Sequence, residues 1–146
     1  MAARTGEEFT QGTTGSEQGE RLTRRVGQCA GISSMADGAR RALMFEPRGH
    51  HDMYGAVLLP AHREDADIAV LFMHNEGYST MCGHGIIALT AGLIEEGLYP
   101  GRVPQTVIRW ETPAGLVTAT ASTETVEDGH VEVTGVRFVN VPAYLH

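Results

Sequence analysis

The segment that most constrains the fold is residues 85–96, an apolar run long enough for three turns of helix. Its apolar positions are Ile86, Ile87, Leu89, Ala91, Leu93 and Ile94. At 100° per residue these side chains leave little of the helix surface polar before the last turn. We therefore expect a central helix that other parts of the chain cover on most sides, with Ser79 or Thr80 as its N-cap and Gly97 at its end.

Short apolar segments on both sides of this helix are typical of β-strands separated by turns. They are residues 54–59, 68–73, 105–110, 116–121, 130–133 and 135–141. The first two follow each other across a charged turn, which predicts an antiparallel pair. The expected fold class is α+β, with a β-sheet wrapped around one central helix.

The 146 residues suffice for one domain with a hydrophobic core. Residues 1–39 are rich in polar and small side chains, which predicts a poorly ordered leader of uncertain origin. Residues 40–146 are the expected folded domain. The sequence contains neither an apolar run of membrane-spanning length nor the apolar centre of a secretory signal, so we expect a cytoplasmic protein that does not interact with membranes.

Charge and composition exclude several kinds of function. The net charge of −7 disfavours binding to a phosphate backbone, so nucleic acid is not an expected partner. The eleven basic residues are all arginine, and without a lysine the chain cannot hold pyridoxal phosphate as a Schiff base. The two cysteines, Cys29 and Cys82, are expected to be reduced thiols in the cytoplasm, and the role of Cys29 stays open.

Cys82 stands where the first turn of the expected helix begins. Unpaired N–H groups and the helix dipole favour an anion there, and a thiolate can act as a general base. Gly83 permits close approach of a substrate carboxylate to the same N–H groups, and His84 can hydrogen-bond the substrate or tune the thiolate. These residues predict a site for an α-amino or α-imino acid whose α-hydrogen faces Cys82.

Two simpler interpretations stand beside this one. A cysteine next to an apolar helix is often only a small core residue. A metal site would need the group His50, His51, Asp52, Cys82 and His84 to match a known ligand spacing, and it matches none of the zinc patterns. We expect neither a metal nor a cofactor.

Two ordered motifs resemble the proline racemase family. They are Ala-Leu-Met-Phe-Glu-Pro-Arg-Gly-His at residues 42–50 and the stretch from His74 to Leu89, which contains Met-Cys-Gly-His-Gly at residues 81–85. The resemblance runs from about residue 40 to residue 144. The sequence His-Asn-Glu-Gly-Tyr-Ser before the cysteine is most similar to the trans-3-hydroxy-L-proline dehydratases of this family.

The resemblance implies a diaminopimelate-epimerase-like fold of two similar halves, with the substrate held between two helix N-termini. In it Cys82 matches the catalytic base of the first half, and Gly83 and His84 match residues that bind the substrate. The implied reaction is dehydration of trans-3-hydroxy-L-proline to 1-pyrroline-2-carboxylate, without a cofactor. The implied partner is therefore a small imino acid.

Other interpretations stay open at this point. The second half of the family fold and its acid–base residue lie outside this chain, so we expect an N-terminal fragment with half an active site and little activity alone. A proline racemase or a 4-hydroxyproline 2-epimerase is the nearest alternative. A truncated, non-catalytic binding module is another, and a homodimer that brings two Cys82 thiols face to face is a third.

Overall fold

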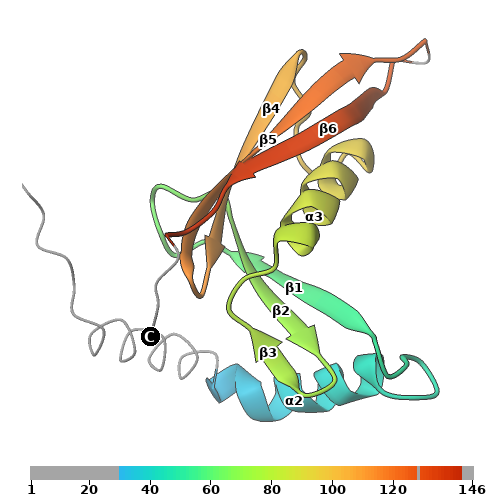
Figure 1. Cartoon of the computed structure of the whole chain (residues 1–146), viewed down its shortest axis with the longest axis vertical. Coiled ribbons are helices and arrows are strands. Elements are labelled where there is room, and N and C mark those ends of the chain that lie inside the picture. Colours follow the sequence, from blue (N-terminus) through green and yellow to red (C-terminus); the bar gives the residue numbers. More distant parts are fainter. Residues whose placement is uncertain (1–29, 128, 143–146) are drawn as a thin grey trace, which may run out of the picture.

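The computed structural model describes residues 30–127 and 129–142, which fold into a mixed sheet and two helices (Figure 1). In chain order the elements are α2 (Ala30–Met44), β1 (Tyr54–Pro60), β2 (Ile68–His74), β3 (Gly77–Ser79), α3 (Gly83–Glu95), β4 (Gln105–Thr112), β5 (Gly115–Thr125) and β6 (Val131–Val139). The α+β class predicted from the sequence is confirmed. No helix within the described ranges is long and apolar enough to cross a membrane.

The six strands follow the order β1-β2-β4-β5-β6, and β3 pairs with β2 on the side that β4 also uses. The predicted antiparallel pair is confirmed, because β1 and β2 align from Tyr54 opposite His74 to Pro60 opposite Ile68. Among the strands of the described ranges, only β2 and β4 run parallel, over two residue pairs. This short parallel contact joins the β1–β3 part of the sheet to the three long strands β4, β5 and β6.

The last strand differs from the prediction. Residues 130–133 and 135–141 were expected as two strands, but β6 is one strand that pairs with β5 throughout. The register shifts where Ser122 faces Gly135 and Thr123 faces Val133, so Thr134 is an extra residue on β6. A β-bulge therefore absorbs the interruption that the sequence pattern presents as a turn.

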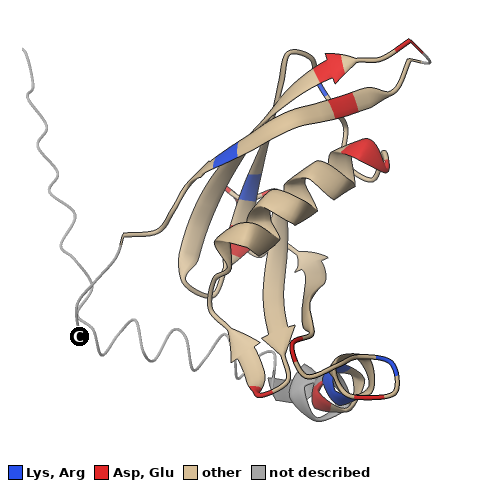
Figure 2. Ribbon diagram, turned by 45° about the vertical axis from the view of Figure 1, so that its right-hand side comes forward, with Lys and Arg blue, Asp and Glu red and all other residues tan. Residues whose placement is uncertain are grey.

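Helix α3 lies along the long strands β5 and β6 (Figure 1). Its buried residues, Ile86, Thr90, Leu93 and Ile94, share the face toward the sheet. The prediction that other parts of the chain cover α3 on most sides is wrong for the described residues, because Ile87 keeps 38% of its surface exposed and Ala88 is exposed too. The sheet lies on one side of the helix only. Charged residues on α3 are confined to its C-terminal end (Figure 2).

The core lies between α3 and the sheet, and Trp110 on β4 is its largest fully buried side chain. The indole Nε1 of Trp110 donates a hydrogen bond to Oγ1 of Thr90 at 3.1 Å, and both side chains are fully buried. A buried indole N–H requires such a partner. This bond fixes α3 on β4, and with it the position of the helix start.

Helix α2 crosses the expected boundary between the leader and the domain. Residues 30–39 were expected to be poorly ordered, but they belong to the same helix as Arg40 and Met44. Arg40 is buried, forms an ion pair with Asp37 at 2.8 Å and donates to the carbonyl of His74 at 2.7 Å. The apolar residues of α2 are few and mostly small, and a polar stretch precedes them, so the composition of residues 1–39 outweighed the helical spacing in the prediction. Residues 1–29 lie outside the described residues.

Candidate active site

Cys82 is the N-cap of α3, with the extended backbone angles φ −142° and ψ 111°. Its Sγ accepts a hydrogen bond from the N–H of Gly85 at 3.3 Å, and its carbonyl accepts from the N–H of Ile86 at 2.9 Å. The predicted caps, Ser79 and Thr80, are wrong. Ser79 is paired with β2 as the last residue of β3, so the chain is still extended there, and the sulfur takes the acceptor role of a cap.

The two glycines that flank His84 are packed against aromatic rings. A Cβ added to Gly83 would lie 2.9 Å from Cζ of Phe138, and one added to Gly85 would lie closer still to Cε1 of Phe72. Phe72 comes from β2 and Phe138 from β6, so the start of α3 is wedged between two parts of the sheet. Packing alone therefore accounts for both glycines of the Cys-Gly-His-Gly motif.

The first turn of α3 brings Cys82, Gly83 and His84 together, as their adjacency in the sequence predicts. The backbone N–H groups of Gly83 and His84 donate to no acceptor within the part of the chain that the structure describes. The His84 side chain is exposed, and Cys82 is half-buried against the edge of the core. Free N–H groups at a helix start form an anion site, and here the thiol stands beside it.

Tyr54, which the sequence reasoning missed, also reaches this thiol. Its phenol interacts with the side chains of Ser79 and Cys82. Burial raises the pKa of Tyr54, the hydrogen bond with Ser79 lowers it, and the interaction with Cys82 raises it. The Tyr54 ring stacks on His74 at a centroid distance of 6.0 Å and touches the Phe72 ring at 6.1 Å. No local sequence signal links a tyrosine to a cysteine 28 positions away. The pairing of β1 with β2 places Tyr54 in this part of the fold.

The histidine loop before β1 does not join the site as a metal centre. Asn75 donates from Nδ2 to the backbone carbonyls of His50 and His51, while both histidine side chains stay exposed. The neighbouring Asp52 contacts His51 at the surface. Within residues 30–127 and 129–142, no three His, Cys, Asp or Glu side chains are grouped as ligands for a metal.

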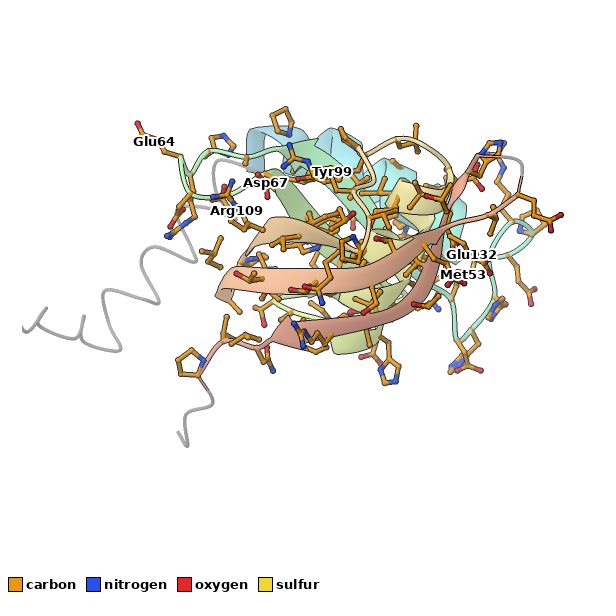
Figure 3. The ribbon with its side chains drawn as sticks, turned by 90° about the horizontal axis from the view of Figure 1, so that it is seen from above. Met53, Glu64, Asp67, Tyr99, Arg109 and Glu132 are labelled. Carbon is orange, nitrogen blue, oxygen red and sulfur yellow. The ribbon has the colours of Figure 1, made fainter. Side chains whose placement is uncertain are left out.

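An ion pair between β4 and the residue before β2 belongs to the scaffold. Arg109 on β4 and Asp67 before β2 face each other, with Nη2 and Oδ1 2.7 Å apart and Tyr99 beside them (Figure 3). Hydrogen bonds from Arg109 lower the pKa of Asp67. The backbone N–H of Arg109 also donates to Asp67 at 2.8 Å. These contacts tie the start of β2 to β4, close to their short parallel pairing.

Comparison with known proteins gives a consistent result. The proline racemase family model matches residues 13–146, so the match begins within the expected leader. A trans-L-3-hydroxyproline dehydratase of Xenopus tropicalis is 50% identical over 114 residues, covering 77% of this chain and 31% of that protein. A 3-hydroxyproline 2-epimerase of Burkholderia multivorans is 42% identical over 142 residues, covering 96% of this chain and 40% of that protein.

A solved structure shares the fold. The crystal structure of a hydroxyproline epimerase from Agrobacterium vitis with bound trans-4-hydroxy-L-proline superposes with a TM-score of 0.57 at 36% sequence identity. The match covers 63% of this chain and 26% of that one. The chain thus spans about a third of the length of its curated relatives.

Proposed function

Because the chain belongs to the proline racemase family, we propose that its Cys82 is the base that removes the α-hydrogen of a proline-type imino acid. The observation that carries this proposal is the position of Cys82, whose Sγ caps α3 next to the free N–H groups of Gly83 and His84. The preferred reaction is dehydration of trans-3-hydroxy-L-proline to 1-pyrroline-2-carboxylate. Support comes from the dehydratases of Xenopus tropicalis and Burkholderia cenocepacia, at 50% and 45% identity.

In the proposed reaction the substrate carboxylate binds the N–H groups of Gly83 and His84, and the exposed His84 side chain contacts the carboxylate or the ring nitrogen. The Cys82 thiolate takes the α-hydrogen as a proton. The electron pair left on the α-carbon forms a double bond to C3, and the 3-hydroxyl leaves with a proton as water. The resulting enamine tautomerises to 1-pyrroline-2-carboxylate, and no cofactor takes part.

The chain is proposed to supply one half of a diaminopimelate-epimerase-like active site. In this view the domain expected over residues 40–146, extended by α2, is the first of two similar halves. The exposed side of α3, at Ile87 and Ala88, supports a second half there because the sheet leaves it uncovered. That second half would supply the other acid–base group and close the pocket against water, so the chain alone is expected to have little activity.

Epimerisation is the alternative reaction, and the Burkholderia multivorans epimerase favours it by matching 96% of this chain. Cys82 would again remove the α-hydrogen, but a proton would return to the opposite face of the α-carbon. In D2O an epimerase incorporates deuterium at the α-carbon of both epimers. A dehydratase instead releases 1-pyrroline-2-carboxylate and forms no second epimer.

A homodimer is a further way to complete the site. Two copies that meet through the exposed sides of α3 would bring two Cys82 thiols near one substrate. The uncharged length of α3 supports such contact, since its charged residues lie at the C-terminal end. Sedimentation velocity across a range of concentrations tests this, and a monomer at every concentration would exclude it. The expected cytoplasmic location stays a prediction that cell fractionation can check.

A chimera tests the proposed function directly. This chain replaces the matching N-terminal region of the Xenopus tropicalis dehydratase, and the same chimera with Cys82→Ser is the control. We expect the first chimera to convert trans-3-hydroxy-L-proline to 1-pyrroline-2-carboxylate, and the control to be at least about 100-fold slower, as is usual when a general base is lost. A folded chimera without activity on any proline-type imino acid would favour the non-catalytic binding module.

A further inference from the structure

We propose that Thr112 is a positioning residue for Cys82, because its hydroxyl closes the turn that connects β4 to β5 and this turn holds the backbone just before Cys82. The role assigned to Thr112 rests on the proposed function of Cys82 as the base. We call residues 112–115 the β4–β5 turn.

The β4–β5 turn is restricted by its own sequence. Thr112 and Gly115 face each other as the last residue of β4 and the first of β5. Oγ1 of Thr112 donates to the carbonyl of Gly115 at 2.8 Å and accepts from its N–H at 3.2 Å. Between them, the ring of Pro113 fixes one φ angle, and Gly115 has a φ of +140°, which a residue with a side chain rarely adopts. These features leave the turn a narrow range of shapes.

The β4–β5 turn contacts the short connection that carries Cys82. The N–H of Ala114 donates to the carbonyl of Thr80 at 3.2 Å. Thr80 follows β3 directly, and residues 80–82 are the whole connection between β3 and α3. At the other end of this connection, the carbonyl of Cys82 accepts from the N–H of Ile86 in the first turn of α3. The bond from Ala114 therefore holds to the long strands a segment that is otherwise held by β3 and α3.

This bond lies where the two parts of the sheet meet. The pairing of β2 with β4 joins these parts over only two residue pairs. The start of α3 is wedged between Phe72 of one part and Phe138 of the other. The bond from Ala114 to Thr80 is a further link between the parts, two residues before the sulfur. A displacement of one part relative to the other would move Cys82, and the β4–β5 turn opposes that displacement.

The proposed chemistry is sensitive to such a displacement. The substrate carboxylate is proposed to bind the N–H groups of Gly83 and His84, so the distance from Sγ of Cys82 to the α-hydrogen depends on the backbone at the N-cap. Small errors in the placement of a reacting group lower the rate strongly. A turn that fixes this backbone would therefore support the reaction without contacting the substrate.

Thr106 provides a matched control at the other end of β4. Its Oγ1 accepts from the N–H of Arg102 at 2.7 Å and donates to the carbonyl of the same residue at 3.0 Å. Thr112 and Thr106 are 1% and 2% exposed, so valine at either position removes one buried hydroxyl and the same two kinds of bond. Only the loss at Thr112 should reach Cys82.

The test measures the hydrogen exchange of single amides by NMR in the complete chain. In Thr112→Val we expect the amides of Ala114 and Ile86 to exchange about three- to tenfold faster, which corresponds to the loss of one hydrogen bond. Thr106→Val should leave these two amides unchanged and accelerate that of Arg102 instead. Thr112→Ser keeps the hydroxyl and should keep both rates within about twofold of the original chain.

Unchanged exchange of Ile86 in Thr112→Val would overturn the assignment, and so would equal acceleration in Thr112→Val and Thr106→Val. Should Thr112→Val not fold, as judged by circular dichroism, Gly115→Ala disturbs the same turn, because its Cβ would lie 3.2 Å from Cγ1 of Val141 and its φ is positive. Unchanged exchange of the same two amides in that variant would also overturn the assignment.

The chimera separates this proposal from the proposed function. In an active chimera, Thr112→Val should lower kcat by about three- to tenfold and Thr106→Val should not. An unchanged kcat in Thr112→Val would remove the positioning role and leave Cys82 as the base. No substrate enters the exchange measurement, so an inactive chimera would remove the proposed function without affecting the link from the turn to Cys82.

Discussion

Replacing Thr90 with valine should loosen the attachment of α3 to the sheet. Thr90 and Trp110 are both fully buried, and the 3.1 Å bond from indole Nε1 to Oγ1 is their polar contact. Valine has nearly the shape and the helix propensity of threonine, so the substitution changes little except that the buried indole N–H loses its acceptor.

The expected cost follows from that unpaired donor. Leaving a buried N–H without a partner costs about 1–3 kcal/mol. The added methyl group offsets up to about 0.8 kcal/mol, because it increases the buried apolar surface. The free energy of unfolding should therefore fall by about 1–2 kcal/mol, which corresponds to a urea midpoint lower by roughly 0.5–1 M.

Urea unfolding followed by circular dichroism measures this effect in a double-mutant cycle with Trp110→Phe. Circular dichroism is needed because Trp110 is the single tryptophan of the chain. In the Trp110→Phe background no indole N–H remains, so Thr90→Val should cost almost nothing there. Equal losses in both backgrounds, or a loss below about 0.5 kcal/mol in the wild type, would refute the reasoning.

Two further predictions concern the packing of the helix start and the charge pair of the scaffold. Gly85→Ala should lower the free energy of unfolding by about 1–3 kcal/mol, because its Cβ would overlap the buried Phe72 ring. The control Gly92→Ala meets nothing within 4 Å and should raise the free energy of unfolding by up to about 1 kcal/mol. Urea titration compares the two variants, and equal effects would contradict the packing of Gly85 against Phe72. Hydrogen bonds from Arg109 hold the pKa of Asp67 below its unfolded value, so this carboxylate stabilises the fold above about pH 4 and the contribution is lost as pH falls through the folded pKa. Asp67→Asn should therefore be less stable at neutral pH and lose less stability on acidification, and parallel curves of unfolding free energy against pH would contradict this.

Local patterns predict the elements whose signal lies in consecutive residues. Apolar spacing is sufficient for α3, and short apolar segments between turn residues are sufficient for β1, β2, β4 and β5. The interruption of the strand pattern near Gly135 could not be interpreted in this way, because a β-bulge and a turn favour the same residue types. Only the pairing of β6 with β5 distinguishes the two.

The candidate site divides in the same way. Cys82, Gly83 and His84 are consecutive, so a helix start predicted at the right place brings them together. Tyr54 reaches the sulfur only through the β1–β2 pairing and the β2–β3 pairing, and neither pairing can be read from residues near Tyr54. The uncovered side of α3 was unpredictable for another reason: an apolar helix face looks the same in sequence whether this chain covers it or another segment does.

The packing of α3 also determines which residues can distinguish an active protein from an inactive one with the same fold. Gly83 and Gly85 pack against the rings of Phe138 and Phe72, so packing accounts for both glycines whether or not a substrate binds. A serine at position 82 would cap the helix at least as well as the sulfur does. Cys82→Ser therefore tests the proposed role of the thiol while an acceptor for the N–H of Gly85 is kept.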